Sequence, residues 1–369
     1  MKFLKSICVL LLLMIGSTCA YSCASIDGYL MNEATVIVWN KQTHTEHFIR
    51  RATFDDIKGR SVGFIVPTPS VPELVEANED VIHNLNRLAE PETETRELPV
   101  VNLTSWLVQS WKLSIFEAHD PTLDADSAAA DAALPAVEVL QHQRIGDLDA
   151  TTVRASDAKA LNRWLAKHDY SSSPAFENWL KNYVQKGWVV TAFKFARHSN
   201  DSALSSPLIR MSFKTDQPFY PYSEPQDAKA IGGRQLAIYL FASGRMQAAP
   251  GKFGKSKKWR GEVKWSDDVQ NHPKRLKNFE PPLSQQLGLP EDDLKQAHWM
   301  TVFEDYSPSR QGDDDVIFIP APDEKIVPPT IVKYENTQTN IPVEGVVLIV
   351  VMVGVLIKAR SGRNNSEVE

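Results

Sequence analysis

Residues 173–196 read SPAFENWLKNYVQKGWVVTAFKFA, a helix pattern that leads directly into a strand pattern. Ser173 and Pro174 are residue types favoured at the cap and at the first position of a helix. The apolar residues that follow recur at helical spacing and form one stripe: Phe176, Trp179, Leu180, Tyr183 and Val184. Gly187 supplies a stop, and residues 188–196 place Val189, Thr191, Phe193 and Phe195 on one face of a strand. The stretch therefore predicts a helix followed by a strand.

The rest of the chain carries more strand patterns than helix patterns. Residues 34–40 and 46–54 predict a β-hairpin around 41–43. Further strands are expected at 61–66, 100–117, 137–155 (as a pair), 207–214, 235–242, 299–305 and 315–319. A helix that Asn78 can cap is expected at 78–89, and another opens at Ser156-Asp157. Strands adjacent in sequence, with helices clustered between them, favour an α+β fold on a mostly antiparallel sheet.

Three prolines interrupt the third predicted strand, in GFIVPTPSVP at 63–72. Proline has no N–H to donate to a sheet ladder, so Pro67 either ends the strand or confines it to a sheet edge. Pro69 and Pro72 fix the backbone of the segment that follows. We therefore interpret this segment as a rigid strap over the core rather than as a polyproline ligand.

The N-terminus has the composition of a secretory leader. Lys2 and Lys5 precede an apolar run and a small-residue exit, which is typical of a signal peptide and too short for an ordinary membrane span. Cleavage after Ala20 or after Ser22 fits this pattern, and the alternative is a buried N-terminal helix. We predict a signal peptide at 1–20 and an extracytoplasmic α+β domain at 21–335, with an Ala/Asp-rich exposed loop at 118–136.

The C-terminus predicts an anchor. Residues 345–357 are apolar or glycine, and Lys358, Arg360 and Arg363 follow, as expected at a cytoplasmic end. We predict a single transmembrane helix at 341–357 and a cytoplasmic tail at 358–369, although a span normally needs about 20 apolar residues. A buried core segment and a sorting signal that is later removed are the alternatives. The predicted location is the bacterial inner membrane, with the domain in the periplasm or outside the cell.

Charge and cysteine content are consistent with export. The formal charge of −6 becomes −8 when a leader carrying two lysines and no acid is removed, which argues against a nucleic-acid partner. Hydrophobic residues make up 43% of the chain, as in a globular protein. Only Cys23 remains after cleavage at Ala20, so no intrachain disulfide can form. Its thiol can be free, paired with another chain or lipidated.

A few groups of side chains in the sequence could hold a metal or a cofactor. His44, Glu46 and His47 form the densest cluster, but on a strand His47 points away from the other two, which is poor for chelation. Asp124 and Asp126 lack the glycine and the closing glutamate of a calcium loop. A solvated turn before a strand explains residues 313–315, and we predict neither a metal site nor a cofactor.

We found no local catalytic motif in the sequence. Gly232 and Gly233 are consistent with a turn rather than with a phosphate-binding loop, and no serine stands in a nucleophile elbow. Cys23 lies near a chain end without a local helper. The sequence therefore identifies no catalytic residue.

One segment, KFGKSKKWRGEVKW at 252–265, combines basic and aromatic residues. Its members are Lys252, Lys255, Lys257, Lys258, Arg260 and Lys264 with Phe253, Trp259 and Trp265. Outside the cytoplasm such a patch favours an anionic polymer or lipid surface, or another envelope component, over nucleic acid. The alternative is a solvated loop.

Several of these motifs together resemble a known family. The hairpin ATVIVWN…HFIRRATF, then GFIVPTPSVPELV, GDLDATTVRASDAKALNRWLAKHDY, NYVQKGWVVTAFKF and SPLIRMSFKTDQPFYPY, are similar to the bacterial secreted proteins catalogued as domain of unknown function 2330. The resemblance covers most of residues 33–222 and implies an exported, often membrane-anchored protein. It also implies a Cys-Gly pair near the mature N-terminus, where this chain has Cys23-Ala24, so no disulfide is carried over. The family is uncharacterised and brings no catalytic residue.

Two functions follow as expectations. The favoured one is a non-enzymatic, membrane-anchored module that binds or supports a component of the cell envelope. The alternative is an envelope hydrolase whose site is assembled from distant residues, for example His142, His168 and His198 with nearby acids. A pocket that joins a histidine, an acid and a nucleophile would favour the enzyme.

Overall fold

A computed structural model describes the chain in sections. The described residues are 29–55, 62–91, 93–100, 137–170, 172–196, 203–228, 233–277, 279–327, 331–338, 351–356 and 358. The chain divides into two compact units, one formed by 1–90 with 121–328 and the other by 91–120 with 329–369. In the second unit, β5 (Thr93–Val100) and β17 (Ile331–Gln338) pair in parallel. The first unit contains the three sheets and the helices described below.

The largest sheet grows from the predicted hairpin. β1 (Tyr29–Asn40) and β2 (Thr45–Asp55) pair antiparallel around a turn at 41–44, with Ile37 opposite Phe48. The strand order is β14-β15-β12-β1-β2-β10-β4, with β9 on β2. The added strands are β4 (Glu73–Glu76), β9 (Ala203–Ser205), β10 (Ile209–Lys214), β12 (Gln235–Ala242), β14 (Glu262–Asp268) and β15 (Trp299–Asp305). Only the β1–β12 pair is parallel, so the sheet is mixed but mainly antiparallel.

Two smaller sheets complete the first unit. The order β3-β8-β7-β6 makes an antiparallel sheet of β3 (Gly63–Thr68), β6 (Val137–Ile145), β7 (Leu148–Ala155) and β8 (Val189–Phe195). The order β11-β16-β13 makes a third sheet of β11 (Phe219–Tyr220), β13 (Met246–Ala248) and β16 (Val316–Pro320). One hydrophobic cluster joins the three sheets, because Phe48 of the large sheet, Phe64 of the second and Phe318 of the third all belong to it.

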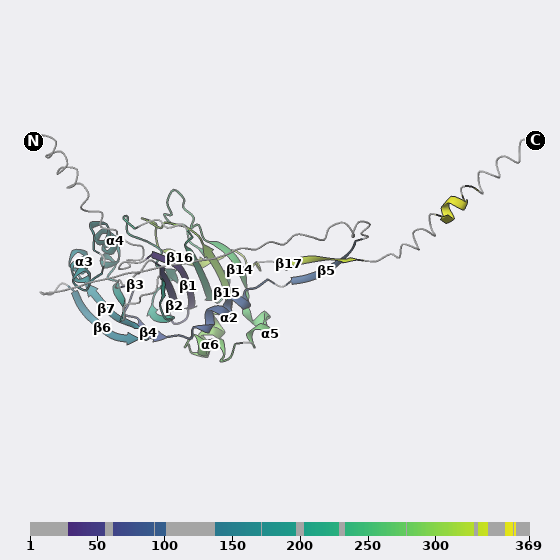
Figure 1. The fold of residues 1–369 in the computed structure, drawn as a ribbon. Coiled ribbons are helices and arrows are strands. Elements are labelled where there is room, and N and C mark those ends of the chain that lie inside the picture. Colours follow the sequence, from purple (N-terminus) through teal and green to yellow (C-terminus); the bar gives the residue numbers. More distant parts are fainter. Residues whose placement is uncertain are drawn as a thin grey trace, which may run out of the picture. The chain divides into compact units, whose positions relative to one another are not determined.

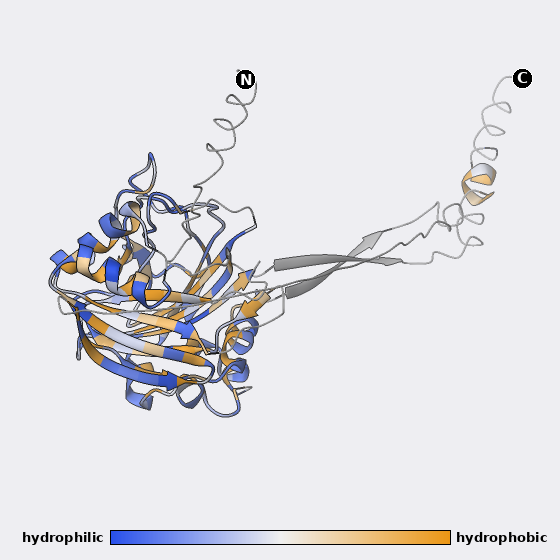
Figure 2. Cartoon of the chain, turned by 60° about the vertical axis from the view of Figure 1, so that its left-hand side comes forward, coloured by the Kyte–Doolittle hydropathy of each residue, from blue (hydrophilic) through white to orange (hydrophobic). Residues whose placement is uncertain are grey.

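Helices cover the two outer faces of this layered unit (Figure 1). Val36 and Val38 point away from the inter-sheet core and pack with α2 (Asp80–Leu88) and the short helices α5 (Pro273–Leu276), α6 (Leu283–Gln286) and α7 (Glu291–Gln296). Val153 and Val190 pack with α3 (Ala158–Lys167) and α4 (Pro174–Gln185). Figure 2 shows the hydrophobic residues concentrated along the strands and hydrophilic ones on the outward sides of the helices.

The predicted fold class needs correction. The structure is sheet-rich, with mostly antiparallel, mixed sheets, and its helices lie on two separate faces instead of clustering together. Among the described residues, no helix has both the length and the apolar character needed to cross a membrane, and the predicted transmembrane helix is not found there. The apolar run at 345–357 is shorter than the roughly 20 residues of a normal span. Of the predicted segment 341–357, the structure describes 351–356, as helix.

Several predicted elements agree with the structure, whereas others lie outside the described residues. α4 begins after Ser173, whose hydroxyl accepts the Phe176 backbone N–H at 3.0 Å, as the sequence pattern indicates. At α2 the N-cap is Glu79 and not the predicted Asn78, although the Asn78 side chain accepts the Asp80 N–H at 2.8 Å. The predicted signal peptide at 1–20, the loop at 118–136 and nearly all of the strand at 100–117 lie outside the described residues.

The proline segment connects two sheets. Pro67 and Thr68 still pair with Val190 and Val189, so the strand does not end at the proline but lies at the edge of the second sheet. Residues 69–72 then lead into β4, at the edge of the large sheet. Pro72 is buried and Pro69 is half-buried. The prolines thus stiffen a crossing between two packed layers.

Candidate functional site

A carboxylate lies at the centre of the inter-sheet core. Glu33 of β1 has a side chain with no exposed surface, and three arginines donate to it. The donors are Arg50 at 2.7 Å, Arg310 at 2.9 Å and Arg234 at 3.2 Å, with the Tyr220 hydroxyl at 2.6 Å. Burial by itself raises the pKa of Glu33, but attraction to the three arginines and the Tyr220 hydrogen bond lower it below its usual range. Glu33 is therefore ionised.

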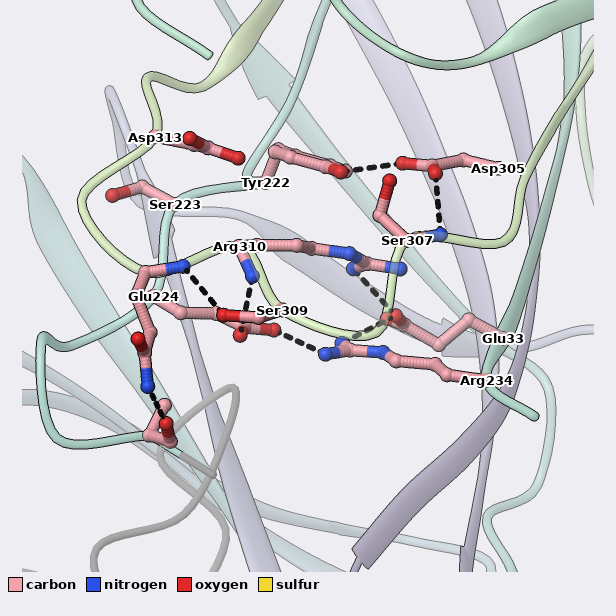
Figure 3. A network of polar contacts seen from close by, with 12 residues as sticks. Glu33, Tyr222, Ser223, Glu224, Arg234, Asp305, Ser307, Ser309, Arg310 and Asp313 are labelled. Atoms are coloured by element: carbon pink, nitrogen blue, oxygen red, sulfur yellow. Dashed lines mark hydrogen bonds and ion pairs between the residues drawn. The ribbon is translucent and has the colours of Figure 1, made fainter. Parts of the chain in front are cut away.

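A second carboxylate, Glu224, continues this network into two loops (Figure 3). Its side chain is fully buried and accepts from Arg234 and from the Arg310 backbone N–H. The backbones also exchange hydrogen bonds, from Glu224 N to Arg310 O and from Gly312 N to Glu224 O. The Arg310 guanidinium lies 4.6 Å from the ring centre of Tyr222, a cation–π distance. The network thereby fastens the loops around 224 and 310 to β1 and β12.

Asp305, at the end of β15, extends the same cluster toward the basic segment. It accepts hydrogen bonds from the Tyr222 hydroxyl and from the Trp259 indole N–H at 3.0 Å. It also accepts the Ser307 backbone N–H at 2.8 Å. Trp259 belongs to the predicted basic and aromatic segment at 252–265, so its hydrogen bond to Asp305 fixes that segment to the buried cluster.

This charge cluster is a structural brace. Its three arginines balance Glu33, Glu224 and Asp305, and none of the six residues is more than 6% exposed. Buried ions require paired charges, and the glutamates and arginines of the cluster are paired. Among the described residues, Nε and Nη2 of Arg310 are buried without a hydrogen-bond partner. A ligand cannot reach groups that are so deeply covered. We therefore assign the cluster to the support of the surface above it.

That surface is a hairpin at 251–260, which we call the lysine hairpin. Gly251 donates to the Lys257 carbonyl at 2.9 Å, and Phe253 pairs with Ser256. Two aspartates accept hydrogen bonds from its backbone. Asp313 accepts the Gly254 N–H at 2.6 Å, and Asp314 accepts the Lys252 N–H at 2.7 Å. These contacts give the hairpin a defined shape.

The aspartates correct an interpretation made from the sequence. Residues 313–315 are not a solvated turn, because Asp313 is only 4% exposed and also forms an ion pair with Arg260 at 2.6 Å. Asp315 accepts the Tyr183 hydroxyl at 3.0 Å and the Ser223 N–H at 3.1 Å. Each aspartate thus has a structural partner from a distant segment.

The basic and aromatic residues of 252–265 separate in the structure. Phe253, Trp259 and Trp265 are buried, whereas Lys252, Lys255, Lys257 and Lys258 are exposed. Within the described part of the chain, no carboxylate lies within 4.0 Å of the amino groups of these four lysines. Arg260 differs, because its guanidinium is bound to Asp313. The hairpin therefore presents four unpaired positive charges on a fixed support.

The predicted ligand-like cluster on the first hairpin is divided by the sheet. His44 occupies the turn with φ 51°, and Glu46 points into the core, where Oε2 accepts the Phe219 N–H at 2.9 Å. His47 points to the opposite face and contacts Ser212. In the described residues, no group of three or more His, Cys, Asp or Glu side chains is arranged to hold a metal ion.

The histidines considered for a hydrolase occupy different elements. His142 lies on β6 and contacts the Thr151 hydroxyl at 2.9 Å. His168 follows α3 and contacts the Trp164 carbonyl at 2.7 Å. His198 lies outside the described residues. A shallow depression of about 300 Å³ between α3 and α4 is lined by polar residues such as Asp157 and Lys181, without a histidine.

The buried cluster was missed from the sequence, although it has a sequence signal. Glu33 shares the face of β1 that carries Ile37 and Trp39, and Arg50 shares the face of β2 that carries Phe48. A charged residue in register with the apolar face of a strand has to be buried and paired. The partners Arg234 and Arg310 follow much later in the chain, and no local pattern identifies them.

Comparisons with known proteins add a family and no activity. A family model described as "Uncharacterized protein conserved in bacteria (DUF2330)" matches residues 15–289. No curated protein and no solved structure matches the chain.

Proposed function

We propose that this chain, which belongs to the family of uncharacterized bacterial proteins called domain of unknown function 2330, is an exported binding module of the cell envelope. The lysine hairpin is its contact surface, and the anionic groups of an envelope polymer or lipid are its ligand. The observation that carries the proposal is the group of four exposed lysines on a braced hairpin, for which the described residues supply no acidic partner. The leader pattern at 1–20 supports export.

The physical case rests on unpaired charge. An exposed lysine that is paired with a carboxylate contributes little to the binding of an anionic ligand, because the carboxylate competes with the ligand for the lysine. The hairpin lysines have no such competitor within the described residues. The buried Trp259 and the bound Asp313 fix the backbone, so the lysines are held near one another before a ligand binds. Each basic group close to an anionic membrane adds about 1 kcal/mol.

The test is a charge-matched pair of triple variants. Lys255→Ala, Lys257→Ala and Lys258→Ala together should weaken binding to phosphatidylglycerol vesicles or to a soluble polyphosphate by on the order of 100-fold. Co-sedimentation measures the vesicle arm and fluorescence anisotropy the polymer arm, and the arm that binds identifies the source of the anionic group. Arg260 is left intact because it is part of the support.

The control removes three exposed lysines elsewhere, Lys159, Lys167 and Lys181, and leaves the same net charge. It should bind like the wild type, and both variants should keep the wild-type melting temperature. Equal weakening of binding by the two triple variants would show that binding depends on net charge and not on the lysine hairpin. No salt-dependent binding by the wild type in either arm would refute the proposal.

A further inference from the structure

A serine, a histidine and an aspartate meet on the outer face of the large sheet. Ser212 of β10 and His47 of β2 are direct cross-strand partners, and Ser212 Oγ lies 2.8 Å from His47 Nδ1. On the other side of the ring, His47 Nε2 lies 3.2 Å from Asp293 Oδ2, on α7, which is an ion-pair distance, although Nε2 makes no hydrogen bond among the described residues. The three side chains thus form one chain of polar contacts from a hydroxyl to a carboxylate.

The surroundings set the protonation state of this chain. Burial lowers the pKa of His47, and the positive charge of Arg210 acts in the same direction, whereas Asp293 and Glu73 oppose them. The imidazole is therefore neutral at pH 7. Asp293 favours the tautomer with the proton on Nε2, which leaves Nδ1 as the acceptor facing the serine hydroxyl.

Asp293 is itself held in position. Asn40, at the end of β1, donates from Nδ2 to Asp293 Oδ1 at 2.5 Å. The Asn40 side-chain oxygen accepts the backbone N–H groups of Gln42 and Thr43 at 3.0 and 3.1 Å, which fixes its orientation. The carboxylate is thereby kept against the histidine by the turn of the first hairpin, as a positioning group should be.

A positive group lies on the same face as the serine. Arg210 precedes Ser212 by two residues on β10, so both side chains point to one side of the sheet. Its Nη2 lies 3.5 Å from Glu73 and its Nη1 donates to the Gly288 carbonyl. Its Nε has no acceptor among the described residues, although it is buried. A donor of this kind can stabilise negative charge that develops beside Ser212.

From this geometry we infer that Ser212, His47 and Asp293 form an acyl-transfer site that hydrolyses small carboxylic esters. Ser212 is the nucleophile, His47 is the general base, and Asp293 positions the ring. Ser212 is half-buried and His47 is covered, so in this inference a small acyl group lies against the exposed part of the serine. The site uses none of the residues of the lysine hairpin, and its failure would leave the binding proposal intact.

The reaction balances with water as the second reactant. The Ser212 oxygen forms a bond to the acyl carbon, and its proton passes to His47 Nδ1. The ester C–O bond breaks, and the leaving alcohol takes that proton. Water then attacks the acyl-serine in the same way, which releases the carboxylic acid and restores the hydroxyl.

The first experiment tests the wild-type protein for a reactive Ser212. A fluorophosphonate probe should form a bond to Ser212 Oγ with loss of fluoride, and peptide mass spectrometry should locate the adduct on that residue. p-Nitrophenyl acetate should be hydrolysed with the same pH dependence as labelling. A folded wild-type protein that gives no adduct on Ser212 would overturn the inference, because no variant is involved.

Variants then separate catalysis from structure. Ser212→Ala should abolish labelling, and Ser205→Ala, which removes an exposed hydroxyl on β9, should not change it. His47→Gln should slow labelling by about 100-fold or more, as expected for loss of a general base. Asp293→Asn should shift the pH profile of labelling to lower pH, because Asp293 raises the pKa of His47. Labelling that His47→Gln leaves unchanged in a folded protein would show that the serine is not activated.

Discussion

Glu33 and Glu46 face the same inter-sheet core from neighbouring strands, yet their surroundings move their pKa values in opposite directions. Glu33 has three arginines and is held in the ionised form. Among the described residues, no basic partner offsets the burial of Glu46. Burial raises the pKa of Glu46 well above its usual value, while the hydrogen bond from the Phe219 N–H opposes that shift. Its Oε1 has no hydrogen-bond partner in the described structure. Local pairing, not burial alone, therefore decides the charge of a core carboxyl.

Glu46→Gln should stabilise the protein at neutral and alkaline pH. Because the pKa of Glu46 is higher in the folded state, the folded protein favours the protonated side chain. The resulting stabilisation is complete below the unfolded-state pKa of about 4.3 and is lost as pH rises toward the folded-state pKa. The amide keeps an oxygen for the Phe219 N–H and does not titrate. In urea titrations, the free energy of unfolding of the wild type should fall relative to the variant by up to about 1.4 kcal/mol per pH unit in that window. A constant difference between pH 5 and pH 8 would contradict this assignment.

Glu33→Gln should destabilise the folded protein strongly. It removes the negative charge on which Arg50, Arg234 and Arg310 converge, and breaking a buried ion pair in this way typically costs about 3–5 kcal/mol. Chemical denaturation at pH 7 measures the change. Glu138→Gln, which removes one partner of an exposed pair with Arg154, should change the free energy of unfolding by less than about 1 kcal/mol. Similar losses in both variants would show that the cluster is no brace.

At the scale of elements, two loops of the first unit have conformations that are as well defined as those of the strands they join. The segment 69–72 links an edge strand of one sheet to an edge strand of another. The lysine hairpin is likewise tied to the loop at 305–314 by Asp305, Asp313 and Asp314. Both are loops whose conformation is fixed by side chains and prolines rather than by a sheet ladder.

Pro69→Ala should lower the free energy of unfolding by about 0.4–1 kcal/mol. The proline restricts the unfolded chain, and its loss increases the entropy that folding must overcome. Thermal and urea unfolding measure this change. Val71→Ala, at an exposed neighbouring position, should stay within about 0.5 kcal/mol of the wild type. Full stability of the proline variant together with loss of a binding partner would instead identify the segment as a ligand for an aromatic groove.

At the scale of the whole molecule, the first unit places its two chemical surfaces apart in the fold. The lysine hairpin rests on the polar cluster of the inter-sheet core, through Trp259 and Asp305. The contacts from Ser212 through His47 to Asp293 lie on the opposite face of the large sheet, where α7 packs. One sheet thus supports the proposed binding surface on one face and the proposed reactive serine on the other. The two proposals can therefore be tested independently.

The sequence by itself determined the local elements and the family. The first hairpin, the cap of α4 at Ser173 and the strands β8, β10, β12, β15 and β16 follow from spacing and residue type, which act over a few neighbours. The prediction that the helices cluster together was wrong, because helix placement depends on which sheet faces remain uncovered. The predicted transmembrane helix is not found among the described residues.

Only the tertiary structure decided which polar side chains meet. Arg310 reaches Glu33 across 277 positions of the chain, and Ser212 meets His47 across 165. Such contacts depend on strand order and register, since a shift of one residue would turn each side chain to the other face. Local patterns act over a few residues and contain no information about that register. The long-range packing of the sheets therefore created both the brace under the lysines and the chain of contacts at Ser212.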